Sequence, residues 1–233
     1  MSYVERLVAS PVVACTWEQA STNEHEQRIV PDACVDLIWA AGGRLTVAGP
    51  DTRARVVTLE SGSGLVGVRL RPGTAGAILG LPASELRDVS ADATEVLGRD
   101  VVAALLEELA GGSDPHALLL RAVELRGTEL DPFLRAAVVA LGRPRARVEP
   151  VADELGVSAR QLHRRVSDAV GYGPKMLQRV LRFRRLQTLP PAPLVELALD
   201  AGYADQAHMT AEVTRLTGVS PVRFLKDRMP TAA

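Results

Sequence analysis

The chain has 233 residues, of which 47% are hydrophobic and 24% charged, and its formal net charge is −1. This composition is ordinary for a folded globular protein and excludes intrinsic disorder and collagen-like repeats. Taken over the whole chain, the near-zero net charge argues against nucleic-acid binding, which usually goes with a basic excess. The length allows one large domain or two smaller ones.

The first seventy residues have the pattern of a β-rich domain. Short stretches rich in Val, Leu, Ile and Thr are separated by turn sequences that contain Gly, Pro, Ser or Asp. This spacing is typical of a small barrel or sandwich. The predicted strands span residues 11–16, 35–40, 45–48, 55–59 and 65–70.

Beyond about residue 73 the apolar residues recur at helical spacing, and the pattern stays helical to the end of the chain. Two of the predicted helices, 100–110 and 115–126, have strong apolar faces. Packing onto the β-rich part and forming a dimer interface explain these faces equally well. The first predicted helices span residues 74–79, 82–87, 100–110, 115–126 and 131–141.

A domain boundary is expected near Gly127, where Gly127-Thr128 interrupts the helical pattern. The charge is divided unevenly at this point. Residues 1–127 hold 11 basic and 17 acidic residues, whereas residues 128–233 hold 16 basic and 11 acidic residues. Residues 143–185 alone hold 11 basic and 4 acidic residues. An Arg-rich helical domain behind an acidic one favours a nucleic-acid partner, which the overall charge conceals.

Residues 148–169 have the pattern of two helices joined by a short turn. The first helix ends at Gly156, and Ser158 is a good N-cap for the second. In the second helix Leu162 and Val166 lie four residues apart and are expected to face inward. Two helices with a short turn containing Gly predict a helix-turn-helix.

The outward face of this second helix carries hydrogen-bonding side chains. At about 100° per residue, Arg160 and Arg164 lie opposite the apolar stripe, and Gln161, His163 and Ser167 flank them. Such groups suit guanine edges, adenine edges and phosphates in a DNA major groove. For an isolated helix a solvated cationic face would be the commoner explanation, but the sequence that follows favours DNA.

The same supersecondary unit occurs twice, about fifty residues apart. Between the two copies a basic helix carries Lys175, Arg179 and Arg182 over an apolar stripe. In the second copy a helix ends at Gly202, and Asp205 caps the helix that follows. This internal duplication is the most specific feature of the sequence.

Residues 128–233 resemble the DNA-binding domain of AraC/XylS-family transcription regulators. In the first unit the resemblance rests on Leu155-Gly156-Val157-Ser158-Ala159-Arg160-Gln161-Leu162-His163-Arg164. In the second it rests on Ala201-Gly202-Tyr203-Ala204-Asp205-Gln206-Ala207-His208-Met209 and Gly218-Val219-Ser220-Pro221. The resemblance implies two helix-turn-helix units joined by a long helix, each placing its second helix in a major groove of double-stranded DNA.

The second unit departs from the family pattern. Where the family usually has an aromatic residue, an Arg and a Phe-Lys pair, this chain has Met209, Ala211, Val213 and Thr214. Alanine cannot donate a hydrogen bond to a base. We therefore expect the first unit and the linking helix to supply most of the affinity, while the second unit mainly positions the protein. The predicted DNA-binding residues are Ser158, Arg160, Gln161, His163, Arg164, Ser167, Lys175, Arg179, Arg182, Asp205, Gln206, His208 and Thr210.

Residues 1–110 resemble a sensor-like domain of uncharacterised function that is often found before such DNA-binding domains. The resemblance rests on Val30-Pro31-Asp32-Ala33-Cys34-Val35-Asp36-Leu37-Ile38-Trp39 and on Gly67-Val68-Arg69-Leu70-Arg71-Pro72-Gly73. It implies a β-rich, cupin-like barrel with additional helices, and it names no ligand.

Arg69, Arg71 and Asp36 are candidate ligand-binding residues in this domain. Arg69 and Arg71 lie two residues apart, so on a strand they share one face and could bind an anionic effector. Pairing with carboxylates such as Asp32 or Asp36 is the commoner use of such arginines.

No metal, cofactor or catalytic residue is expected. His25, Asp32, Cys34 and Asp36 are metal-ligand types, but their spacing matches no compact zinc pattern. Cys15 and Cys34 could form a redox pair, although buried unpaired cysteines are commoner. The sequence also lacks a nucleophile motif and a Gly-rich phosphate loop.

The sequence therefore predicts a DNA-binding transcription regulator, not an enzyme, with residues 1–127 as a sensor or dimerisation domain. A small-molecule effector or homodimerisation would control it. No signal peptide is visible, and no apolar run approaches the roughly 20 residues that span a bilayer, so we expect a cytoplasmic protein without a membrane partner. Two alternatives stay open. One is a cupin-like metalloenzyme or Cys-dependent repair protein fused to a DNA-binding module, and the other is a ligand-independent architectural DNA binder.

Overall fold

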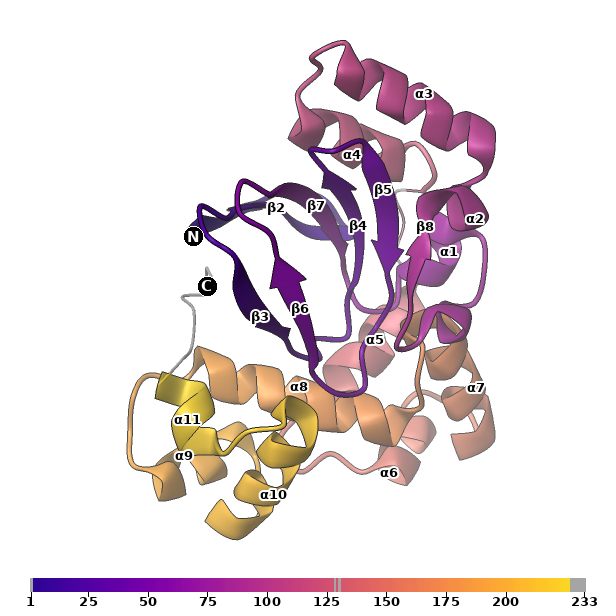
Figure 1. Ribbon diagram of the computed structural model, residues 1–233. Helices are drawn as coiled ribbons and strands as arrows, with labels where there is room; N and C mark the ends of the chain where they lie inside the picture. Colours follow the sequence, from indigo (N-terminus) through magenta and orange to yellow (C-terminus); the bar gives the residue numbers. More distant parts are fainter. Residues whose placement is uncertain (1, 128, 130, 227–233) are drawn as a thin grey trace.

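The computed structural model describes residues 2–127, 129 and 131–226, and it confirms the predicted α+β class with a β-rich first part. Antiparallel strands form a six-stranded sheet with the order β1-β2-β7-β4-β5-β8, and β3 pairs with β6 in a separate two-stranded sheet (Figure 1). The strands are β1 (Ser2–Leu7), β2 (Val13–Ala20), β3 (His25–Ile29), β4 (Val35–Ala40), β5 (Arg44–Ala48), β6 (Arg55–Leu59), β7 (Gly64–Leu70) and β8 (Ser90–Asp92).

Three of these strands, β1, β3 and β8, have no counterpart among the predicted strands. Their sequences are rich in charged and polar residues, and their side chains are exposed or only half-buried. They therefore lack the apolar alternation that marks a strand with a buried face. Backbone pairing with β2, β6 and β5 holds them in place instead.

Helices cover one face of the six-stranded sheet. They are α1 (Ala75–Leu79), the 3-10 helix η1 (Ala83–Leu86), α2 (Ala93–Leu97), α3 (Arg99–Ala110) and α4 (Pro115–Glu124). Leu37, Val47 and Leu70 of the sheet form one core with Leu105 of α3 and Leu119 of α4. The strong apolar faces of α3 and α4 are thus used for packing onto the sheet.

The described residues from 131 to 226 form helices with short connections, as predicted, and they build two cores that share one long helix. Leu177 and Val180 of this helix, α8, lie in the first core, whereas Phe183 and Leu186 lie in the second. The helices are α5 (Pro132–Leu141), α6 (Val148–Glu154), α7 (Ala159–Val170), α8 (Pro174–Thr188), α9 (Leu194–Ala201), α10 (Gln206–Thr217) and α11 (Pro221–Lys226).

The β-rich part packs directly on the helical part. Ala33, in the loop before β4, is buried in the first helical core, and Val30 packs against the second. Helices α1 and η1 lie against α7 (Figure 1). No helix within the described ranges is both long enough and apolar enough to span a membrane.

Candidate nucleic-acid interface

The first helix-turn-helix consists of α6, a short turn and α7. Gly156 in the turn has a φ of 68°, a left-handed conformation that glycine adopts without a side-chain clash. Ser158 and Gln161 then form a capping box. The Gln161 backbone nitrogen donates to Ser158 Oγ at 3.2 Å, and the Ser158 backbone nitrogen donates to Gln161 Oε1 at 2.9 Å. These bonds satisfy donors that the first turn of a helix leaves free, so α7 begins at a defined residue.

The exposed face of α7 carries two arginines that are free to bind. Arg160 and Arg164 are exposed, and neither has a hydrogen-bond or ionic partner among the described residues. His163 is also exposed, but it lies against the backbone at Gly173, where an added Cβ would stand 2.5 Å from its Nε2 atom. Ser167 is half-buried and lies 3.4 Å from His163 Nδ1. Ser158 and Gln161 are committed to the cap, which leaves the two guanidinium groups as the main donors of this face.

Most of the predicted basic side chains of α8 contact other parts of the protein. Arg179 Nε donates to Glu212 Oε2 of α10 at 2.5 Å, and the Arg182 guanidinium lies 5.3 Å from the centre of the Tyr203 ring. Lys175, at the start of α8, is exposed and has no partner among the residues that the structure describes. Thus Arg179 and Arg182 join α8 to the second unit.

The second helix-turn-helix consists of α9, a turn and α10. Asp205 caps α10 by accepting a hydrogen bond of 2.7 Å from the His208 backbone nitrogen. His208 Nδ1 in turn accepts from the Ala204 backbone nitrogen at 3.2 Å. Thr210 Oγ1 donates to the Gln206 backbone oxygen at 2.8 Å. Of the four predicted residues in this unit, only Gln206 therefore has a side chain without a partner in the described part of the chain.

The outward face of α10 is as poor in donors as the sequence predicts. Ala207, Ala211 and Thr214 are exposed, whereas Met209 and Val213 are fully buried. Between α7 and α10, the exposed cations without a partner among the described residues, Arg160 and Arg164, lie on α7, whereas α10 offers an amide and small side chains. The expectation of unequal contributions from the two units stays a prediction.

Two further candidates lie on the loop before α6. Arg145 and Arg147 are exposed and unpaired within the described residues, and Arg145 has a φ of 58°. In helix-turn-helix proteins the first helix runs across the DNA backbone, so arginines at its start are in a position suited to phosphate contacts. The signal for these residues in the sequence is the Arg-x-Arg-x-Arg run at 143–147, within the basic segment 143–185.

Two of the three predicted ligand-binding residues of the β-rich part, Arg69 and Asp36, lie in a buried ionic cluster. Arg69 donates from Nε and Nη2 to the two Asp36 carboxylate oxygens, each at 3.0 Å, and from Nη1 to Glu5 at 3.2 Å. Asp32 lies 3.4 Å from the same guanidinium. Burial raises the pKa of Asp36, and the Arg69 charge opposes this shift. Arg71 instead donates to the Ser10 backbone oxygen at 3.2 Å. Arg69 therefore pairs with carboxylates, which is the commoner use of such an arginine.

Both cysteines are buried free thiols. Burial raises the pKa of Cys15 to about 11 and also raises the pKa of Cys34. A thiol that resists ionisation is a poor nucleophile and a poor metal ligand. Within the described ranges, no group of three or more His, Cys, Asp and Glu side chains is arranged to hold a metal ion.

Two family models match separate parts of the chain. Residues 151–227 match the model described as a Helix-turn-helix domain, and residues 8–92 match the Domain of unknown function (DUF6597). No curated protein matches the chain.

Several solved structures are similar to this chain. The C-terminal domain of AraT, a response regulator from Geobacillus stearothermophilus, is 25% identical over 44% of this chain and 90% of its own, with a TM-score of 0.40. ToxT from Vibrio cholerae O395 is 11% identical over 97% of each chain, with a TM-score of 0.44. Fatty-acid-bound ToxT from strain SCE256 is 10% identical over 100% of this chain and 98% of its own, with a TM-score of 0.46.

The TM-scores lie below 0.5, so the assignment depends on the family models and on the duplicated unit described above. The C-terminal part of this chain carries a helix-turn-helix domain of the AraC type, and a domain of unknown function precedes it.

Proposed function

We propose that this protein binds specific DNA sequences and regulates transcription, and that its β-rich domain controls the placement of the two recognition helices, α7 and α10. The N-terminal ends of both helices are capped by their own side chains, Ser158 and Asp205. The face of each helix that points away from its core is exposed. This leaves two helix faces for two major grooves.

The first unit supplies the stronger contacts. Arg160 and Arg164 carry fork-shaped donors that match guanine edges and phosphates. Lys175 and the loop arginines Arg145 and Arg147 add cations that suit the DNA backbone. Each phosphate contact releases counterions, so binding is expected to weaken steeply as salt is added.

The second unit supplies position more than affinity. Gln206 is the side chain of α10 best suited to an adenine edge. Ala207 and Ala211 offer apolar contact with thymine methyl groups at most. The pairing of Arg179 with Glu212 holds α10 against α8, so the second helix follows the first as a semi-rigid body.

The observation that carries the proposal of control is that the β-rich domain contacts the C-terminal end of each recognition helix. The backbone nitrogen of Ala54 donates to the Leu216 backbone oxygen of α10 at 2.7 Å. At the end of α7, an added Cβ at Gly171 would stand 2.4 Å from Pro50 Cγ and 3.0 Å from the Ala83 backbone oxygen. A rearrangement of this domain would therefore change the placement of both helices.

Such control requires a ligand or a partner that binds two arrangements of the protein with different affinity. The apolar faces of α3 and α4 are largely buried against the sheet, with Val102, Leu105, Leu118 and Leu119 at most 7% exposed. Because these faces are already used, we favour a small-molecule effector over dimerisation through these helices.

Selection of binding sites from a random DNA library with the purified full chain tests this function. We expect enrichment of one sequence with two blocks about one helical turn apart, and a Kd that rises steeply with salt. Arg164→Ala should weaken binding to the enriched sequence about tenfold, whereas Arg121→Ala should leave it unchanged, because Arg121 pairs with Glu108 on the other domain. Failure of the wild-type chain to enrich any sequence would contradict the proposal.

A further inference from the structure

We propose that a polar hollow at the junction of the two helix-turn-helix units binds one phosphate of the DNA backbone, between the two grooves that α7 and α10 enter. This step rests on the proposed function. No carboxylate is among the described residues that line the hollow. Its walls come from both units and from the helix that joins them: Arg143 and Ala146 of the loop between α5 and α6, Gln178, Arg182 and Arg185 of α8, and Ala201 of α9.

The size of the hollow fits part of a phosphate and not a whole small molecule. The centre of a water-sized group can move within only about 10 Å³, and the whole hollow, including its mouth open to solvent, measures about 220 Å³. A non-bridging phosphate oxygen is similar in size to a water molecule, so one such oxygen fits inside while the rest of the phosphate stays at the mouth. Phosphates on the outer edge of a duplex can be bound in this way, and they fix the register of a protein on DNA.

Arg182 supplies the free cation of the hollow. Its side chain is half-buried, and its guanidinium lies 5.3 Å from the centre of the Tyr203 ring. This cation–π contact leaves the N–H donors without an acceptor, and no oxygen accepts from them among the residues that the structure describes. Arg143 is instead committed to Glu154, at 2.7 Å. The planar donors of Arg182, held against an aromatic ring, therefore match the oxygens of one phosphate.

Hydrogen bonds from α8 hold the loop that forms the opposite wall. Gln178 Nε2 donates to the Ala146 backbone oxygen at 2.9 Å, and Arg185 Nη2 donates to the Gly142 backbone oxygen at 2.8 Å. On the same loop Arg145 has a φ of 58°, a left-handed conformation that few non-glycine residues adopt and that clusters at functional sites. Because the loop is fixed before DNA binds, little ordering cost is added on binding.

Neighbouring cations favour a DNA strand over a free anion. Arg145 and Arg147 flank the lining residue Ala146, and both are exposed without a partner in the described part of the chain. A DNA strand carries phosphates at regular intervals, so the phosphates beside the bound one can reach these side chains. The loop also touches the second unit, since an added Cβ at Gly202 would stand 3.4 Å from Pro144 Cα. A phosphate bound here therefore contacts both units and fixes them in one register on DNA.

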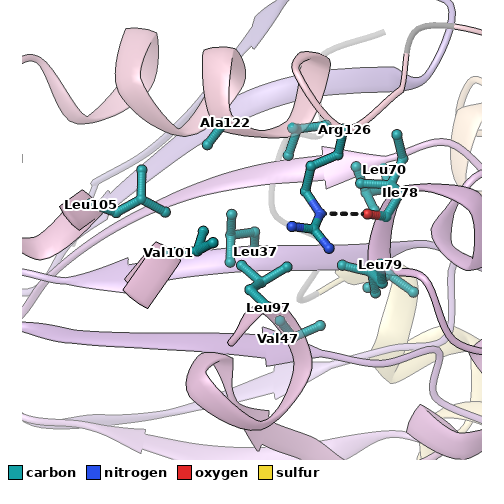
Figure 2. Close-up of a pocket in the computed structure, with 12 residues that line it drawn as sticks. Leu37, Val47, Leu70, Ile78, Leu79, Leu97, Val101, Leu105, Ala122 and Arg126 are labelled. Atoms are coloured by element: carbon teal, nitrogen blue, oxygen red, sulfur yellow. Dashed lines mark hydrogen bonds between the residues drawn. The ribbon is translucent and has the colours of Figure 1, made fainter. Parts of the chain in front are cut away.

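A second hollow, between the six-stranded sheet and helices α3 and α4, has the opposite character. Leu37, Val47 and Leu105 give it an apolar lining, and Arg126 Nε donates to the Ile78 backbone oxygen at 2.7 Å (Figure 2). Arg126 provides a matched control. Arg126→Gln removes one positive charge from the β-rich domain, just as Arg182→Gln removes one from the junction.

Anisotropy titrations at several salt concentrations test the phosphate contact. Arg182→Gln should lower the slope of log Kd against log salt by about one and weaken binding to a selected DNA site about tenfold. Arg126→Gln should leave both quantities unchanged, and a cooperative thermal melt shows that each variant is folded. An unchanged salt slope in Arg182→Gln, or an equal change in Arg126→Gln, would overturn the phosphate site.

Single methylphosphonate substitutions in the selected DNA locate the phosphate, and with the wild-type chain they depend on no protein variant. Each substitution removes the charge of one phosphate. At one or two neighbouring positions between the two blocks, we expect it to raise the Kd of the wild type about tenfold and that of Arg182→Gln less than about twofold. A wild type that responds to no position between the blocks, or an Arg182→Gln variant that responds like the wild type, would show that the assignment is wrong.

Failure of the proposed function gives a different result. A chain that selects no DNA sequence contradicts sequence-specific regulation, but salt slopes on an unselected duplex still decide the site, because backbone contacts do not depend on sequence. Calorimetric titration with inorganic phosphate separates the two sources of the anion. Phosphate binding that Arg182→Gln abolishes, together with an unchanged salt slope for DNA, would assign the hollow to a free anion and overturn the contact with DNA.

Discussion

The guanidinium of Arg28 on β3 donates a hydrogen bond of 2.8 Å to the backbone oxygen of Thr217, the last residue of α10. Next to it, Leu216 oxygen accepts from Ala54 nitrogen. The carbonyls of the last helical turn have no donors within their own helix, and a cation at this end also interacts favourably with the helix dipole. The two-stranded sheet therefore completes the C-terminus of the second recognition helix.

Replacing Arg28 with Ala should loosen this contact. We expect the free energy of unfolding to fall by about 0.5–1.5 kcal/mol, the net value of one such hydrogen bond, and the Kd for a selected DNA site to change. Chemical denaturation and anisotropy titrations measure the two effects. Arg44→Ala, an exposed arginine on β5, is the control, and equal effects of the two substitutions would contradict the contact.

Gly171→Ala tests the contact at the end of the first recognition helix. Gly171 has a φ of 94°, and an added Cβ would stand 2.4 Å from Pro50 Cγ. Gly112 has a φ of 88° with nothing within 4 Å of the added atom, so Gly112→Ala measures backbone strain alone, about 1–2 kcal/mol. We expect Gly171→Ala to lower the free energy of unfolding by about 1–3 kcal/mol more, a typical cost of overpacking. A difference near zero would show that the two domains separate easily.

The helix-turn-helix units could be predicted from the sequence because their signals are local. Ser158 and Asp205 cap helices within three residues of themselves. The four-residue spacing of Leu162 and Val166 predicts that both side chains are buried. The exposure of Ala211 also follows from helical periodicity, so the donor-poor face of α10 could be predicted before any coordinates existed.

The rest depends on pairs that are distant in the sequence. Arg28 and Thr217 are 189 residues apart, and nothing near either residue indicates the other. In the sequence, nothing distinguishes Arg179 from the solvent-exposed cations of the same helix. Only the packing of α8 against α10 shows that Glu212 is its carboxylate partner. Strands β1 and β3 are held by backbone pairing, which leaves no hydrophobic signature. The domain boundary near Gly127 stays a prediction.

Arg164→Ala should weaken DNA binding more than substitutions in the second unit do. A bidentate contact to a base contributes about 1–3 kcal/mol of discrimination, so we expect the Kd at fixed salt to rise about tenfold. His208→Ala should have a smaller effect on affinity, because His208 Nδ1 accepts from the Ala204 backbone nitrogen and serves the start of α10. Equal losses, or a larger loss for His208→Ala, would contradict the unequal roles of the two units.

Both cysteines should resist alkylation in the folded protein. The pKa of Cys15 is raised to about 11 from 9.0, so at about pH 8 roughly one thiol in a thousand is ionised. Iodoacetamide labelling followed by mass spectrometry should find Cys15 and Cys34 unmodified until denaturant is added. Rapid labelling of either residue in the native chain would support the alternative of a Cys-dependent activity.

The raised pKa of Cys15 also makes the free energy of unfolding depend on pH. The folded state holds the thiol proton more tightly than the unfolded state, so this contribution is fully present below about pH 9 and is lost as the pH rises towards 11. We expect Cys15→Ser to flatten the fall in the free energy of unfolding over this interval. Denaturation curves at several pH values measure the slope of the free energy of unfolding against pH. An unchanged slope in Cys15→Ser would show that another group causes the alkaline loss of stability.

Arg179 and Glu212 should behave as one unit. The side chains are 27% and 12% exposed, and their N–O distance is 2.5 Å. Breaking a buried pair from one side leaves the other charge uncompensated, so Arg179→Met and Glu212→Gln should each lower the free energy of unfolding by about 1–3 kcal/mol. The double variant Arg179→Met/Glu212→Leu should recover part of this loss, because replacing both partners leaves no orphaned charge.

The same variants decide whether Arg179, a predicted DNA-binding residue, contacts phosphate directly or acts by holding α10. A direct phosphate contact would lower the slope of log Kd against log salt by about one in Arg179→Met and not in Glu212→Gln. We expect instead that both variants weaken DNA binding to a similar extent with an unchanged slope, because the Arg179 guanidinium faces the Glu212 carboxylate. Because the Glu212 carboxylate already balances the Arg179 charge, a salt slope that falls in Arg179→Met alone would show that Arg179 contacts phosphate on DNA.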